Sequence, residues 1–117
     1  LILNAASATN GGTWVADRAT LTGTTLASQG TTQAGELTVN YGQLNNSGTL
    51  LGNPQLNINA DQVTQSAGGK LLSGGNLWLQ RKGREVGGQL SSLGDLTLNR
   101  TKAFTRKTAV AAGRTLT

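Results

Sequence analysis

Short words in which two aliphatic residues flank a variable residue recur along this sequence, and most of them end on an amide. The words begin at Leu1, Leu37, Leu56, Leu77, Leu96 and Leu116. From Leu37 onward a new word begins roughly every 20 residues, and a fixed period of this length is typical of a solenoid. Leu21, which precedes Leu37 by somewhat less than one period, is interpreted as a degenerate member.

The alternation within each word indicates a half-buried strand. Period two places both aliphatic residues on one face and the variable residue on the other. We expect these residues to face inward: Leu37, Val39, Leu56, Ile58, Leu77, Leu79, Leu96 and Leu98. Trp78 holds the variable position of its word, so it should point outward, where an aromatic ring can stack on a sugar or contact a protein. Trp14 aligns with Leu50 and Leu71 of later repeats and should fill the core.

Further short apolar segments lie between the words, and clusters of Gly, Asn and Ser such as 45–48 and 73–76 separate them as turns. A unit of this size with two or three such strands cannot bury its own apolar face, but stacked units can. The sequence therefore predicts an all-β fold, a parallel β-helix of five to six coils. We treat residues 1–117 as one repeat segment, cut from a much larger protein.

The amide that closes each word should recur at one position of every coil. The amides in question are Asn4, Asn40, Asn59, Gln80 and Asn99. Stacked amides can form a ladder of side-chain hydrogen bonds. The alternative is that each residue merely favours a turn. Both interpretations give these residues a structural role.

Candidate catalytic and metal-binding residues are scarce. The chain has no His and no Cys, which excludes a His-dependent triad, a Cys nucleophile and an ordinary zinc site. Its five acids are widely separated along the chain, unlike those of a calcium loop. We expect no metal, no cofactor and no catalytic residue. The alternative is a polysaccharide-cleaving β-helix that uses Glu36, Asp61 or Asp95, since Glu36 and Asp95 each precede a word and could share one corner of the coils.

Positive charge gathers in the more divergent part of the chain, residues 81–117. That part holds eight of the ten Lys and Arg with two acids, whereas 1–80 holds two and three, so the net charges are +6 and −1. Stacked coils would gather the basic residues into one patch. The candidate polyanion-binding residues are Arg81, Lys82, Arg84, Arg100, Lys102, Arg106 and Lys107. Specific nucleic-acid binding is not expected, because only Phe104 interleaves with them. The alternative is a solvated face that guards a β-rod against aggregation.

Residues 36–80 carry a resemblance to a known family. The words Leu37-Thr-Val-Asn40, Gly42-Gln-Leu-Asn-Asn-Ser-Gly-Thr-Leu-Leu-Gly52 and Gly74-Gly-Asn-Leu77 resemble the haemagglutinin repeats of filamentous haemagglutinin-like exoproteins. The resemblance covers about two thirds of the chain. It implies a right-handed parallel β-helix in a very large adhesin or contact-dependent inhibition exoprotein. It also implies two-partner secretion through an outer-membrane transporter to the surface of a Gram-negative bacterium.

The function expected from these observations is that of a structural and adhesive shaft, not an enzyme. Its partner would be a glycan or protein receptor on a host or neighbouring cell. The alternative is a binding module for polyanions or glycans through the basic coils 81–107; a polysaccharide-cleaving enzyme is a third possibility. Open coil ends expose unpaired sheet edges, so we also expect end-to-end self-association.

Overall fold

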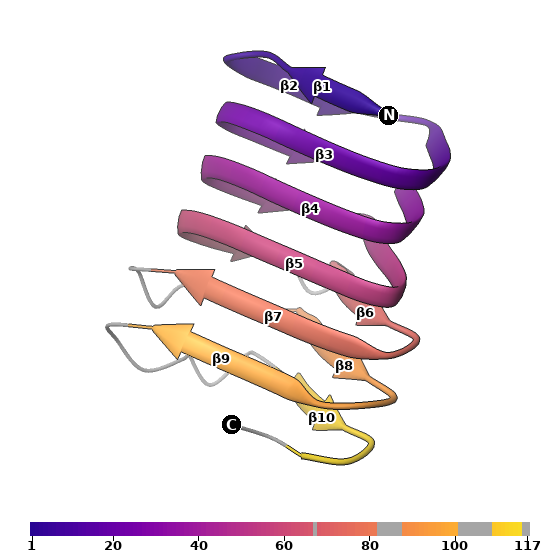
Figure 1. Cartoon of the computed structure of the whole chain (residues 1–117). Coiled ribbons are helices and arrows are strands. Elements are labelled where there is room, and N and C mark those ends of the chain that lie inside the picture. Colours follow the sequence, from indigo (N-terminus) through magenta and orange to yellow (C-terminus); the bar gives the residue numbers. More distant parts are fainter. Residues whose placement is uncertain (67, 82–87, 101–108, 116–117) are drawn as a thin grey trace.

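The structure, a computed structural model, is a stack of parallel strands wound into coils (Figure 1). It describes residues 1–66, 68–81, 88–100 and 109–115. The strands are β1 (Ile2–Asn4), β2 (Ser7–Asn10), β3 (Thr13–Ser28), β4 (Thr31–Asn46), β5 (Thr49–Gln65), β6 (Lys70–Ser73), β7 (Asn76–Arg81), β8 (Gln89–Ser92), β9 (Leu96–Arg100) and β10 (Ala109–Ala112). All the described strand pairings are parallel, and the described residues contain no helix. The predicted parallel β-helix is confirmed, with about five turns.

Each coil contains strand segments of different orientation joined by corners. In β3, β4 and β5 the segments run on as one bent strand, whereas later coils break into separate strands such as β6 and β7 (Figure 1). Ala19 pairs with Leu37, and Leu21 pairs with Val39, so this repeat is slightly shorter than those that follow. The interpretation of Leu21 as the first residue of a word was wrong. Ala19 occupies that position. Because the other words have leucine there, the repeat is hard to recognise in this coil.

The aliphatic residues of the words form two inward columns. Leu37, Val39, Leu56, Ile58, Leu77, Leu79 and Leu96 are each at most 1% exposed, which confirms their predicted orientation. The side chain of Leu98 lies outside the described residues. Burying one such side chain contributes roughly 1.5–3 kcal/mol relative to leaving it in water, so these columns supply the main stabilisation of the stack.

A third inward column comes from the segment that precedes each word. Leu50, Leu71 and Leu90 stack there and are fully buried. Trp14 lies in the same column, because it pairs with Thr32, which pairs with Leu50. Its predicted alignment is therefore confirmed. It is only partly buried, since few coils lie above it in the first turn.

Corner length differs from coil to coil. Between the paired residues Ala34 and Glu36 lies only Gly35, whereas the corresponding corner of β5 inserts Asn53 and Pro54 after Gly52. The longer corner folds back over Gly52. A Cβ atom on Gly52 would lie 2.0 Å from the Gln55 carbonyl oxygen. Only glycine fits without movement of the backbone there.

Candidate functional site

The predicted basic residues fall mainly on two connections between strands. Lys82 and Arg84 lie within 82–87, and Lys102, Arg106 and Lys107 lie within 101–108; both ranges are outside the described residues. Arg100 ends β9, and its side chain is likewise not described.

The described strands show where these connections begin and end. Arg81 at the end of β7 pairs with Arg100 at the end of β9, and Gln89 at the start of β8 pairs with Ala109 at the start of β10. The described residues that flank the two connections are therefore paired in neighbouring coils.

Arg81 does not belong to an exposed basic surface. Its side chain is 1% exposed and follows the inward residues Leu77 and Leu79 in the alternation. The same period that buries these leucines turns Arg81 inward. A guanidinium with so little exposed surface is poorly placed to contact a polyanion, and Arg81 lines the groove described below instead.

The amides that close the words stack in register. Asn4, Thr22, Asn40, Asn59, Gln80 and Asn99 occupy one column. Asn59 Nδ2 donates to Asn40 Oδ1 at 3.0 Å, which is one rung of the predicted ladder. Thr22 interrupts the amide series between Asn4 and Asn40. From Asn4 to Gln80 the side chains of this column are partly or fully exposed, so the described part of the column combines a structural contact with an accessible row of polar groups.

A second column of polar residues, which the sequence analysis missed, points inward at another corner. Asn10, Ser28, Asn46 and Gln65 are in register and buried. Asn46 Nδ2 donates to Gln65 Oε1 at 2.7 Å and to the Lys70 carbonyl at 2.9 Å. Asn46 Oδ1 accepts from the Gly48 amide at 3.1 Å. The sequence signal was the spacing Asn-x-Gly, which occurs at both 10–12 and 46–48.

Replacing Asn46 with alanine should lower the free energy of unfolding by about 1–3 kcal/mol, because buried partners lose their hydrogen bonds. Its neighbour Asn45 is an exposed control that accepts from Gln43 Nε2. Asn45→Ala should change the stability by at most about 0.5 kcal/mol. Urea unfolding followed by circular dichroism measures both variants. Equal effects would show that the inward amide is dispensable.

The acids proposed for catalysis lie in a column of polar residues. Glu36, Gln55, Asn76 and Asp95 are successive members, as the word positions predicted. Glu36 and Asp95 are three coils apart, about 14 Å at the spacing of paired strands. Glycosidase carboxylates are about 5–9.5 Å apart. Glu36 and Asp95 therefore cannot act as a pair, and Asp61 lies at a different corner.

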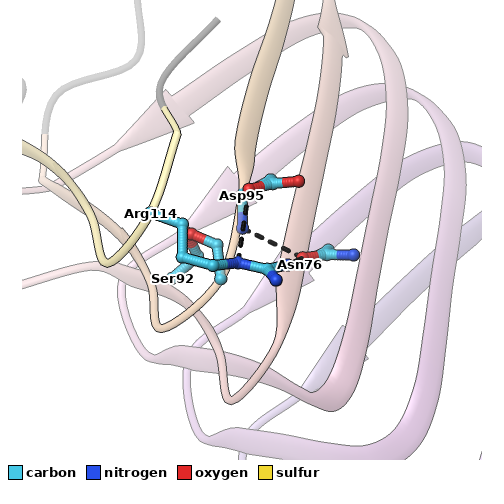
Figure 2. A network of polar contacts seen from close by, with 5 residues as sticks. Asn76, Ser92, Asp95 and Arg114 are labelled. Atoms are coloured by element: carbon cyan, nitrogen blue, oxygen red, sulfur yellow. Dashed lines mark hydrogen bonds and ion pairs between the residues drawn. The ribbon is translucent and has the colours of Figure 1, made fainter.

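Each of these two acids contacts an arginine instead. Arg18 Nε lies 3.3 Å from Glu36 Oε2. At the other end of the column, Arg114 Nε lies 3.5 Å from Asp95 Oδ1, and Asn76 Oδ1 accepts from the Asp95 amide at 2.9 Å and from Arg114 Nη2 at 3.3 Å (Figure 2). All these side chains are at least partly exposed. The network joins adjacent coils at their outer corner.

Among the described residues, a groove of about 460 Å³ runs along the corner that follows the words. Its lining residues are Gly23, Asn40, Tyr41, Gly42, Asn59, Ala60, Asp61, Gln80 and Arg81. Tyr41 is buried beneath it, and its hydroxyl donates to the Ala5 carbonyl at 3.1 Å. Burial raises the pKa of Tyr41 above its ordinary value of 10.0. The lining thus combines amides, one carboxylate, one guanidinium and the buried phenol of Tyr41.

The described residues form no cluster suited to a metal ion, because no group of three or more His, Cys, Asp or Glu side chains is placed to hold one. In the same part of the chain, no helix is long and apolar enough to span a membrane.

Comparison with curated proteins finds relatives over most of the chain. The chain is 40% identical over 90 residues to "Deoxyribonuclease CdiA" of Dickeya dadantii (strain 3937), which is 76% of this chain and 3% of that protein. It is 36% identical over 91 residues to "tRNA nuclease CdiA" of Yersinia mollaretii, which is 78% of this chain and 3% of that protein. No family model matches, and no solved structure matches.

Proposed function

We propose that this chain is a segment of the β-helical shaft of a contact-dependent inhibition exoprotein. The proposal is supported by its similarity to the CdiA exoproteins, a family that the repeated words had also indicated. The observation that carries the proposal is the stack of parallel coils, in which each coil pairs with the next. A solenoid of this kind lengthens by adding coils, and its stability grows with each interface between neighbours. The shaft would hold a contact surface away from the cell.

The location and partners follow from the same proposal. The chain would be secreted through an outer-membrane transporter and displayed on the surface of a Gram-negative bacterium, where it contacts a glycan or protein receptor on another cell. At the first coil, Leu1 and Val15 are exposed and Trp14 is partly exposed. Such open ends favour end-to-end stacking of isolated segments.

We assign no catalytic role to this segment. The relatives are named as nucleases, but this chain aligns with only 3% of each of them. Glu36 and Asp95 are paired with arginines and lie too far apart for general acid–base work. The segment would hold other parts of the exoprotein in position and would not itself catalyse a reaction.

A chimaera tests the shaft function. The aligned residues of the Dickeya relative are replaced by the matching residues of this chain, and a second chimaera carries Leu56→Asp and Ile58→Asp, which place charges in the core. We expect the first chimaera to be displayed and to inhibit neighbouring cells, and the second to fail. Loss of display in the first chimaera, or equal activity of both, would overturn the proposal.

A second candidate function is polyanion binding by the basic connections within 81–107. The observation in its favour is that the described residues that flank the two connections are paired in neighbouring coils. The net charge of +6 over residues 81–117 would attract anionic glycans or the phosphates of lipopolysaccharide.

Retention on immobilised heparin, measured as salt rises, tests this second function. The variant Lys82→Ser, Arg84→Ser, Lys102→Ser and Arg106→Ser is compared with a control in which Arg18 and Lys70, which lie in other parts of the coils, become Ser. Retention that is salt-dependent and lost only in the first variant supports polyanion binding. Weak and equal retention of all three proteins indicates a passive spacer.

A further inference from the structure

The groove that follows the words has the volume of a small-molecule site. Its volume of about 460 Å³ lies within the range of small-molecule pockets, roughly 300–1,000 Å³. One side is formed by Asn40, Asn59 and Gln80, one residue from each of three successive coils. Small residues such as Gly42 and Ala60 keep the corner open. A ligand in the groove would lie along the axis of the stack and meet one amide per coil.

The amides along the groove have hydrogen-bonding capacity to spare. Asn40 Oδ1 and Asn59 Nδ2 are joined to each other. Within the described part of the chain, Asn40 Nδ2, Asn59 Oδ1 and the Gln80 amide make no hydrogen bond, and all three residues are partly or fully exposed. These remaining amide atoms include donors and acceptors, and successive coils space them by about 4.8 Å. Vicinal hydroxyl groups are the ligand chemistry that such a row recognises.

The charges of the groove favour an uncharged ligand. Its described lining contains one acid, Asp61, and one base, Arg81, so the two formal charges cancel. Burial raises the pKa of the Tyr41 phenol, which disfavours its charged form. This groove therefore differs in chemistry from the basic stretches.

An aromatic residue lies beside the row of amides. Trp78 is two residues before Gln80 on β7, so both side chains point to the outer face. Its neighbours Leu77 and Leu79 are buried, whereas Trp78 is partly exposed. In the adjacent coils its column continues as Asn57 and Thr97. The apolar face of a sugar ring can pack on such an indole.

We propose that the groove and Trp78 together bind a neutral oligosaccharide, with the amides of Asn40, Asn59 and Gln80 on its hydroxyl groups and the indole against one ring. The proposal rests on the adhesive shaft function and names the chemistry of a receptor that the shaft contacts. Side chains on successive coils would contact successive sugar units of the ligand.

Titration calorimetry with the whole chain tests the site. The probes are a panel of neutral tetrasaccharides built from glucose, galactose, mannose or N-acetylglucosamine, and a heparin-derived tetrasaccharide. We expect a neutral sugar to bind, and Trp78→Ala and Gln80→Ala each to weaken that binding about tenfold, the equivalent of about 1.4 kcal/mol. Gln33→Ala, an exposed amide on another segment of β4, is the matched control and should leave binding unchanged.

The possible outcomes distinguish a failure of the saccharide-site proposal from a failure of the proposed shaft function. No binding of any neutral tetrasaccharide, binding of the heparin fragment alone, or an equal loss in Gln33→Ala overturns the saccharide site. Circular dichroism of each variant verifies that the coils are intact. If the chimaera is displayed but no neutral sugar binds, the site fails and the shaft stands; if display fails while the sugar binds as expected, the shaft fails and the site stands.

Discussion

Replacing Leu56 with alanine should lower the free energy of unfolding by about 2–5 kcal/mol, the range for removing a large aliphatic side chain from a packed core. Leu56 is 0% exposed and stacks between Leu37 and Leu77 of the adjacent coils. The cavity would touch three coils, and none of them can close it without moving its own strand. Chemical denaturation followed by circular dichroism measures the loss.

Asn57→Ala is the matched control for this experiment. Asn57 is the next residue on β5 and points outward, where its Oδ1 accepts from Gln55 Nε2 at 2.7 Å. Losing this partly buried hydrogen bond should cost at most about 1 kcal/mol. If the two substitutions destabilise the chain equally, the assignment of inward and outward faces is wrong.

Gly52→Ala should destabilise the chain by about 3 kcal/mol or more, because the new methyl group would collide with backbone atoms. The nearest are the Gln55 carbonyl oxygen at 2.0 Å, the Gln55 carbonyl carbon at 2.6 Å and the Leu56 Cα at 2.9 Å. No side-chain rotation relieves these contacts. The corner must shift, and Leu56 must shift with it.

Gly12→Ala provides the comparison, since a Cβ atom there would meet nothing within 4 Å. That substitution should be neutral or stabilise by up to about 1 kcal/mol, because alanine restricts the unfolded chain. Thermal unfolding of both variants distinguishes the two cases. A Gly52→Ala protein as stable as Gly12→Ala would mean that the corner relaxes to the shape found at Ala34 and Ser73 of the neighbouring coils.

The sequence by itself determined the fold class, the inward columns and the outward direction of Trp78. These properties depend on two periods that are visible along the chain. Alternation within a word decides which face each side chain takes, and the longer repeat decides that the words stack. For the same reason the sequence assigned Asn40 and Asn59 to one position of successive coils, where one hydrogen bond joins them.

Only the tertiary structure decided the position of Arg81, the buried role of Asn46 and the contacts of Glu36 and Asp95. Composition marks Arg81 as a surface cation, but the alternation of β7 turns it inward with Leu77 and Leu79. Which polar groups meet across coils depends on the length of each corner, and corners differ by one or more residues. The stacking of whole strands therefore decides which side chains of neighbouring coils meet. The alternation of residues within one strand does not specify this.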